Sequence, residues 1–240
     1  MADPAPLPPL ADTHSRLWLP GASLVACTRG VMARNTFSVT LTEAQRYNHF
    51  PASPFCSLCW WPEGEVAVLP PGAQAHSTSP RRRVHERALF FGPVTGPVVS
   101  HNPGPVRSLM VLIAPDALQA LTGLQPADWV DRCAPVAQAL GDEWAAFSDA
   151  VLAAADEATA VGLIEAFLDI RWQARRPRLP LAGHRYKDWA HALALRAATS
   201  GPGRSLRQVE RRIRQWAGQP LRELQGMVKL EQAFFSVVAA

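Results

Sequence analysis

The chain has 240 residues, of which 48% are hydrophobic and 18% are charged, and this composition excludes a wholly disordered protein. No stretch reaches the roughly 20 consecutive apolar residues of a membrane-spanning helix, and the N-terminus lacks the basic head and apolar run of a secretory signal. With four cysteines and no such signal, we expect a cytoplasmic protein with reduced thiols and no membrane partner.

The positive charges are unevenly distributed along the chain, whose formal net charge is +4. The segment from Arg171 to Arg222 holds 13 of the 24 Arg and Lys residues, and the remainder of the chain is net acidic. This asymmetry favours a polyanionic partner for the C-terminal part, although an arginine-rich surface that is merely solvated has the same composition.

The first 113 residues are predicted to form a tail followed by short strands. Residues 1–15 are proline-rich and offer few large apolar side chains, so a disordered tail is expected there. From residue 16, short apolar or β-branched runs alternate with Pro and Gly, which predicts an antiparallel sandwich or barrel. The expected strands are 23–29, 36–41, 56–60, 66–69, 88–91, 98–100 and 108–113.

After residue 113 the apolar spacing becomes that of helices. Leu163, Phe167 and Ile170 recur at three- and four-residue intervals and predict the second arm of a helical hairpin. Such a hairpin either forms a dimerisation surface or covers one face of the sheet. The expected helices are 114–123, 126–131, 136–155 and 157–174.

The C-terminal part follows a predicted linker at 177–183 and is expected to be helical and basic from residue 184. Ser205 is a favourable N-cap and Gly218 a favourable terminator, so a helix is predicted between them. The apolar residues of this helix fall on one face, which is formed by Leu206, Val209, Ile213 and Trp216.

Arg207, Arg211 and Arg214 lie on roughly the opposite face of the same helix. One face can therefore dock on a core while the other presents guanidinium groups. A preceding helix at 186–199 and a turn at 200–203 complete the order of a helix-turn-helix. Because the major groove of DNA, about 12 Å wide, admits one helix and arginine can pair with guanine, the pattern predicts a groove reader.

The amino-acid sequence of this segment resembles that of a known family. Ser-x-Arg-Gln-x-Glu-Arg-Arg-x-x-x-Trp-x-Gly-Gln at 205–219, followed by Arg-Glu-Leu-Gln at 222–225, is similar to the first helix-turn-helix of AraC/XylS-type transcription regulators. Asn-His-Phe-Pro-Ala-Ser-Pro at 48–54 and Phe-Gly-Pro-Val-Thr-Gly-Pro at 91–97 resemble the sensor domain of some of these regulators.

The resemblance implies an α+β protein. A β-rich, cupin-like sensor and dimerisation domain with a helical hairpin is expected at 16–176, followed by an all-α, partial helix-turn-helix domain at 184–240. The implied function is not enzymatic: it is that of a sequence-specific regulator that binds double-stranded DNA as a homodimer. A small-molecule effector, activation and contact with RNA polymerase belong to the same expectation, and no cofactor or metal is expected.

The resemblance also carries site residues over by position. Arg207, Glu210 and Arg211 are expected to face the groove, with Gln208 and Arg214 beside phosphates or base edges. The predicted DNA-binding set is Arg204, Arg207, Gln208, Glu210, Arg211 and Arg214.

The sequence departs from the family in one respect. Family members hold two helix-turn-helix units joined by a long helix, and 221–238 resembles that joining helix, but the sequence stops at residue 240. The second unit is therefore expected to be missing. This leaves an alternative function, that of a ligand sensor or dimerising partner without specific DNA binding.

Other constellations have competing interpretations. Cys56 and Cys59 form a CxxC in a strand-like run, where buried structural thiols are expected rather than a redox or zinc site. Among the histidines of the β-rich part, His49 and His76 lie nearest to this CxxC in sequence. The basic run 81–87 either binds an anion or is solvated. The aromatic residues Phe55, Trp60, Trp61, Phe90 and Phe91 either line an effector pocket or pack in the core.

Overall fold

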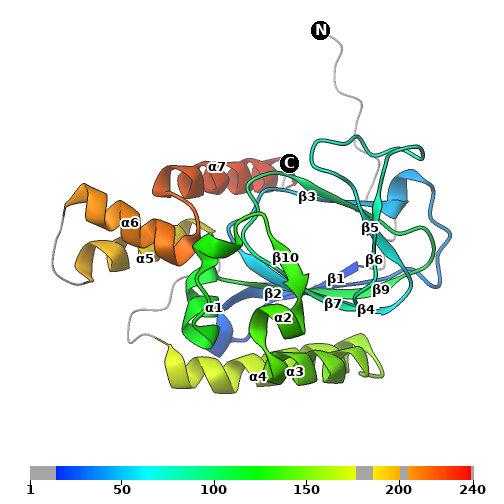
Figure 1. Cartoon of the computed structure of the whole chain (residues 1–240), viewed down its shortest axis with the longest axis horizontal. Helices are drawn as coiled ribbons and strands as arrows, with labels where there is room; N and C mark the ends of the chain where they lie inside the picture. Colours follow the sequence, from blue (N-terminus) through cyan, green and yellow to red (C-terminus); the bar gives the residue numbers. More distant parts are fainter. Residues whose placement is uncertain (1–14, 177–185, 201–204, 239–240) are drawn as a thin grey trace, which may run out of the picture.

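The computed structural model describes residues 15–176, 186–200 and 205–238, with the side chains of the last segment described as far as Lys229 (Figure 1). It combines two antiparallel sheets with α-helices, so the predicted mixed α+β class is confirmed. The predicted linker and residues 1–14 of the predicted tail lie outside the described residues.

The larger sheet has six strands and the smaller has four, and every strand pair is antiparallel. The larger sheet runs in the order β1 (Ser15–Trp18), β2 (Thr28–Asn35), β9 (Arg107–Ile113), β4 (Cys56–Glu63), β7 (Ala88–Phe91) and β10 (Cys133–Pro135). The smaller sheet runs in the order β3 (Tyr47–Phe50), β8 (Val98–His101), β5 (Val66–Val68) and β6 (Arg82–Val84).

The central strand β9 shows how the two faces of the larger sheet differ. Val111 and Ile113 are fully buried and belong to the main core, whereas the alternate residues Met110 and Leu112 are only half-buried. Because successive side chains of a strand point to opposite faces, the first pair shares one face of the sheet and the second pair the other, where Leu112 still packs against the main core cluster. The first face is therefore sealed along β9, whereas the side chains on the second face are less deeply buried.

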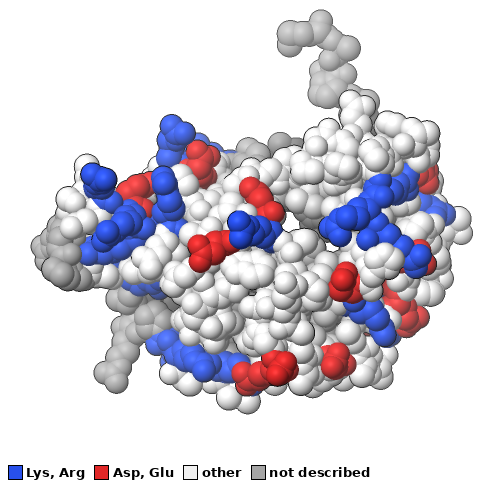
Figure 2. Space-filling model, viewed as in Figure 1, with Lys and Arg blue, Asp and Glu red and all other residues white. Residues whose placement is uncertain are grey.

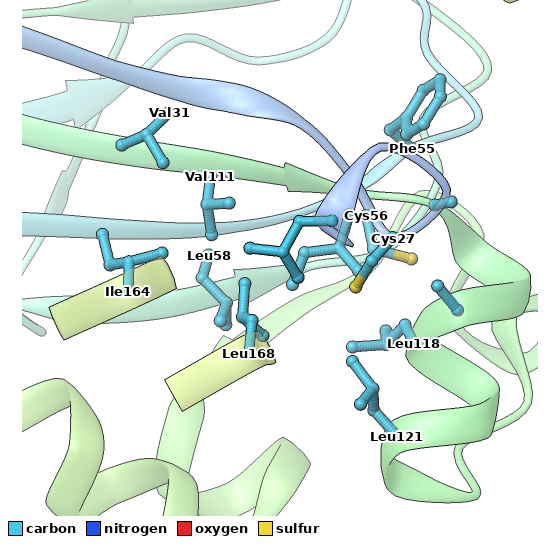
Figure 3. Packing of buried hydrophobic residues seen from close by; sticks show 14 of the residues in the cluster. Cys27, Val31, Phe55, Cys56, Leu58, Val111, Leu118, Leu121, Ile164 and Leu168 are labelled. Atoms are coloured by element: carbon cyan, nitrogen blue, oxygen red, sulfur yellow. The ribbon is translucent and has the colours of Figure 1, made fainter. Parts of the chain in front are cut away.

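Helix α4 (Glu157–Arg175) covers the sealed face. Its residues Ile164 and Leu168 point towards Leu58 and Val111 of the sheet (Figure 3). The helix begins as the sequence predicts, because Asp156 accepts a hydrogen bond from the Thr159 amide at 2.7 Å. The bond lowers the pKa of the Asp156 carboxyl.

The two sheets pack against each other through a small second cluster. Val66 and Val84 of the smaller sheet meet Leu89 of the larger one, and Trp61 and Phe91 lie beside them, partly buried. The predicted aromatic set is therefore divided by the sheet. Trp61 and Phe91 face the smaller sheet, whereas the others belong to the main core, namely Phe55, Trp60 and Phe90.

The short helices follow the sequence prediction with one correction. Helix α1 (Pro115–Thr122) and the 3-10 helix η3 (Pro126–Trp129) are confirmed. The predicted helix 136–155 is wrong as a single element, since it is divided into α2 (Val136–Leu140) and α3 (Asp142–Leu152). Gly141 between them has φ 86°, a left-handed backbone that an α-helix does not contain.

Two predicted strands are wrong. Residues 23–29 mostly form the 3-10 helix η1 (Ala22–Leu24) and its exit, and 36–41 form turns. Thr36 ends the preceding strand because its amide donates to Val106 O and its hydroxyl accepts from Val106 N, each at 2.9 Å. Strands β1, β3, β6 and β10 have no counterpart among the predicted elements, because runs of only three or four residues carry little periodic signal.

The C-terminal helices α5 (Tyr186–Thr199), α6 (Leu206–Ala217) and α7 (Leu221–Val238) contact one another. Their buried residues Leu193, Ala197, Ile213, Ala217 and Leu224 belong to the same core cluster as the sheet-facing residues. Helix α6 also contacts α1 and η3, so the helices lie directly against the β-rich part. Among the described residues, no helix is long and apolar enough to cross a membrane.

Candidate nucleic-acid interface

Helix α6 has the two ends that the sequence predicts. The Ser205 hydroxyl accepts a hydrogen bond from the Gln208 amide at 3.4 Å, and Gly218 ends the helix with φ 75°. The Gly218 amide donates to Arg214 O at 2.8 Å. Both caps are confirmed, and they define a three-turn helix whose orientation depends on the surfaces that it contacts.

The outer face of α6 is cationic. Arg207, Arg211 and Arg214 are all exposed, whereas Ile213 and Ala217 are completely buried. Spacings of four and three residues place the three guanidinium groups on one side of the helix. The predicted division into a docked face and a free arginine face is confirmed for these residues.

Leu206 is the exception on the predicted apolar face. Its exposed fraction is 88%, so its assignment to the docked face is wrong. Leu206 is the first residue of α6, one turn before the first contact of the helix with the core, and helical periodicity alone does not show where a neighbouring surface ends. Val209 and Trp216, by contrast, pack partly buried against the core.

The remaining predicted DNA-binding residues differ in position. Glu210 is half-buried, and its Oε1 accepts a hydrogen bond from the Leu221 amide at 3.2 Å, so this carboxylate caps the start of α7. Gln208 is half-buried in the first turn of α6. Arg204 lies outside the described residues. The structure therefore brings together the three arginines and directs Glu210 towards α7.

Arg212 was not singled out from the sequence, although it follows Arg211 directly. It donates from Nη1 to Ala197 O at 2.9 Å and so joins α6 to the end of α5. Because the sequence does not show where α5 lies, it does not distinguish this half-buried arginine from the exposed Arg211 and Arg214. The structure therefore separates one supporting arginine from three outward-facing ones.

Positive charge extends from α6 to the beginning of α7. Between residues 205 and 229 there are six Arg and Lys residues and two Glu. Arg222 is exposed and pairs with Glu223 at 3.3 Å, and Lys229 is exposed further along α7. Figure 2 shows Lys and Arg side chains gathered over α6 and the adjoining part of α7. Such a patch attracts a polyanion.

The other basic run is used within the protein. Arg81 donates to Tyr47 Oη at 3.2 Å and to the ring of His101 at 2.8 Å, while Arg83 pairs with Glu65 at 2.6 Å. Arg87 donates to backbone carbonyls of the β4 end. These contacts favour a structural role for 81–87 over the predicted anion-binding alternative.

The thiols of β4 are buried on different faces. Cys56 belongs to the main core, and burial raises its pKa well above the ordinary range. Burial raises the pKa of Cys59 to about 12. A buried thiol with a raised pKa is a poor nucleophile. Among the described residues, no group of three or more His, Cys, Asp or Glu side chains is arranged to hold a metal ion.

A cluster of polar side chains links the larger sheet to the smaller one. Arg34 of β2 donates to Asn48 of β3, and Asn48 Nδ2 donates to Ser100 at 3.1 Å and to Asn102 at 2.8 Å. Burial lowers the pKa of Arg34, and its Nε is buried without a hydrogen-bond partner among the described residues. Cross-sheet pairing brings these four residues together, and no local motif marks it.

No protein-family model matches the chain, and no curated protein matches it. The AraC/XylS resemblance therefore stays a prediction that depends on the residues of 205–219 and on the geometry of α6.

Proposed function

We propose that the protein is a sequence-specific, DNA-binding transcription regulator of the AraC/XylS kind. In this proposal α5 and α6 act as a helix-turn-helix, and α6 enters the major groove. The supporting observation is that Arg207, Arg211 and Arg214 project from the outer face of α6 while Ile213 and Ala217 anchor the opposite face. A free arginine edge on a firmly docked helix is the geometry that base recognition requires.

The polar residues of α6 and α7 then have separate roles. Arg207 and Arg211 lie in the first and second turns of α6 and are proposed to contact base edges, whereas Arg214 and Arg222 are proposed to contact phosphates. Glu210 positions α7 instead of reading a base, because its carboxylate already accepts the Leu221 amide. The regulator is proposed to work in the cytoplasm and to activate transcription by contacting RNA polymerase.

The β-rich part is proposed to be a cupin-like barrel that binds a small-molecule effector between its sheets. Half-buried Met110 lies on the same face of the larger sheet as Trp61, which packs against the smaller sheet. Arg34 supplies a positively charged donor whose Nε has no partner among the described residues. These features favour an effector with an apolar body and an acidic group.

Helix α4 is proposed to form the homodimer interface. Leu163 and Ile170 are 37% and 71% exposed on its outer face, and the residues between them include the exposed Ala166. In an antiparallel pair of α4 helices centred beside Ala166, Leu163 lies opposite Ile170. The same apolar patch is then contributed by both copies, as a two-fold interface requires.

The DNA-binding proposal is tested by selection from a mixed duplex pool across a salt series. The wild-type protein should retain particular sequences. Arg207→Ala/Arg211→Ala should weaken that binding by about 100-fold or more, since each bidentate base contact contributes about 1–3 kcal/mol. The matched control is Arg16→Ala/Arg82→Ala, which removes two exposed arginines from the edge strands β1 and β6.

Two results would contradict this proposal. One is equal retention of all sequences by the wild-type protein, and the other is equal loss in both double variants. Weak binding without sequence preference, roughly 10⁻⁴–10⁻⁶ M, is typical of a basic surface alone. That outcome would favour the alternative function of a ligand sensor or dimerising partner.

The dimer proposal has its own test. Ile170→Glu should shift the protein from dimer to monomer in sedimentation equilibrium, because the substitution places a charge in the apolar centre of the interface. Leu195→Glu is the matched control, since Leu195 is a comparably exposed leucine (58%) on α5. A dimer that persists in Ile170→Glu would exclude α4 as the interface.

A further inference from the structure

Asp116 joins the β-rich part to the C-terminal helices. Its Oδ1 accepts a hydrogen bond from Trp189 Nε1, and its Oδ2 accepts one from Arg196 Nη1, each at 2.9 Å. The Asp116 and Arg196 side chains are only 13% and 18% exposed. Both donors come from α5, two helical turns apart, so the carboxylate holds that helix at two points.

The position of Asp116 is set by the larger sheet. Strand β9 ends at Ile113, and α1 begins two residues later at Pro115. The Ala114 amide between them donates to Cys27 O at 2.8 Å, and Ala114 itself is buried. Because so little chain separates β9 from Asp116, a displacement at the end of this strand moves the carboxylate as well.

The contact continues from α5 to α6. The Arg196 guanidinium lies 4.3 Å from the centre of the Trp216 ring, and a cation at this distance is attracted to the ring face. Trp216 is part of the face of α6 that packs on the core. The path from the sheet to α6 therefore runs through Asp116, Arg196 and Trp216.

We call the contact of Asp116 with Trp189 and Arg196 the joint, and two neighbouring contacts support it. Phe55, which precedes β4, packs against Trp189 with ring centres 5.3 Å apart. At the other end of α6, the tightly packed Gly218 lies against Val130 and Pro126. Helix α5 thus contacts the β-rich part through Trp189, and α6 contacts it at the Gly218 end.

We propose that Asp116 is a positioning residue that couples the sheet to α6 and sets the direction in which α6 presents its arginines. The coupling rests on the proposed function, in which α6 reads DNA. Met110 of β9 lies on the same face of the sheet as Trp61, which packs against the smaller sheet, so a molecule bound between the sheets acts on the strand that leads to Asp116. Regulation then consists of a change in the orientation of α6, with no change in its base-contacting residues.

Hydrogen exchange on the free protein tests the joint itself. Asp116→Asn removes the charge that pairs with the half-buried Arg196, and unpairing a buried charge is costly. We expect amides of α5 and α6 to exchange at least about tenfold faster than in the wild type, with β4 and β9 unchanged. Asp149→Asn is the matched control, because Asp149 is an exposed residue of α3.

Arg196→Gln removes the other partner of the same contact and should give the same exchange pattern. Unchanged exchange of α5 and α6 in both variants would overturn the proposal. Faster exchange throughout the chain in Asp116→Asn would indicate general destabilisation, in which case the Arg196→Gln result decides.

Binding to paired half-sites tests the coupling. The probes are one selected half-site and two copies at the best spacing or at a spacing changed by about 5 bp, half a helical turn. The wild type should discriminate between the two spacings. Asp116→Asn should lose most of this discrimination and keep its affinity for the single half-site within about threefold, whereas general destabilisation lowers both.

The two proposals fail in different ways. If the wild type selects no DNA sequence, the proposed function is wrong, and the exchange experiment alone decides whether the joint exists. If the wild type selects DNA and Asp116→Asn retains the spacing preference, the coupling is wrong and the DNA-reading role of α6 stands.

Discussion

Helices α4 and α6 bury one face in the same core cluster but present opposite chemistry to solvent. Ile164 of α4 and Ile213 of α6 are both completely buried. On the outer side, α4 exposes Ile170, whereas α6 exposes Arg207 and Arg211. The buried faces explain the fold, and the outer faces indicate the kind of partner that each helix fits.

Both outer faces carry a cost in the isolated protein. Arg207 and Arg211 are four residues apart, and like charges at this spacing destabilise a helix by about 0.2–0.5 kcal/mol. Exposed Ile170 keeps apolar surface in water. A polyanion relieves the first cost and a second apolar surface relieves the second, which is why the proposal assigns DNA to α6 and a second copy to α4.

The largest expected effect is on the free energy of unfolding, and it distinguishes the buried face of α4 from its exposed face. Ile164→Ala should lower the free energy of unfolding by about 2–5 kcal/mol, because it leaves a cavity between the helix and the sheet. Ile170→Ala should change it by less than about 0.5 kcal/mol at protein concentrations where the chain is monomeric. Urea denaturation measures both, and similar losses in the two variants would show that the faces are misassigned.

A smaller effect is expected where α6 meets the β-rich part. Gly218→Ala should cost about 1–3 kcal/mol, because φ is 75° and a Cβ would lie only 3.1 Å from Val130 and 3.2 Å from Pro126. Gly162→Ala on the open face of α4 is the control and should stabilise by about 0.5–1 kcal/mol. The melting temperature should therefore fall in Gly218→Ala and rise in Gly162→Ala. A shift in the same direction in both variants would contradict the contact at Gly218.

The salt dependence of DNA binding tests which arginines on the outer face of α6 contact phosphates. Arg214→Ala should weaken binding to all duplexes alike and reduce the slope of log K against log salt by about one, as expected for one lost phosphate contact. Arg82→Ala, an exposed arginine of β6, should leave the slope unchanged. A loss confined to particular sequences would instead make Arg214 a base-reading residue.

The smallest expected effect concerns pH and the outer side of the smaller sheet. Burial of His101 lowers its pKa; Arg81 and Arg46 act in the same direction, and Glu43 opposes them. The folded protein therefore favours the neutral ring, which packs 4.7 Å from Tyr47. This stabilisation is present above pH 6.5 and is lost as the pH falls from there towards the lowered pKa.

Urea unfolding at pH 7.5 and 5.5 measures this dependence. His101→Gln should reduce the difference in the free energy of unfolding between pH 7.5 and pH 5.5. His49→Gln, which replaces an exposed residue of the same sheet, should preserve that difference. An unchanged difference in His101→Gln would assign the pH dependence to other groups.

Prediction from the sequence succeeded where the determinants are local. Ser205 and Gly218 end α6 through hydrogen bonds to residues within one turn, so their side chains and spacing were sufficient. Prediction failed at 36–41, which reads as a strand but forms turns after Thr36 pairs with the distant Val106. It also failed at Leu206, because helical periodicity does not reveal how far a neighbouring surface extends.

Asp116 shows what local patterns cannot disclose. After Pro115 it reads as an ordinary acidic residue in the first turn of a helix, which is favourable near a helix N-terminus wherever it occurs. Its partners Trp189 and Arg196 lie more than 70 residues away. Likewise, Glu210 and Arg212 resemble the other polar residues of α6 until α7 and α5 are placed beside them.

The sequence by itself determined the mixed α+β class, the ends of α6 and the division of this helix into apolar and arginine faces. These properties depend on composition, on capping and on helical period, all of which act over a few residues. Only the tertiary structure decided which face of each sheet is sealed, which polar side chains of α6 stay free, and how Asp116 ties α5 to β9. These depend on long-range contacts, whose partners no single segment specifies.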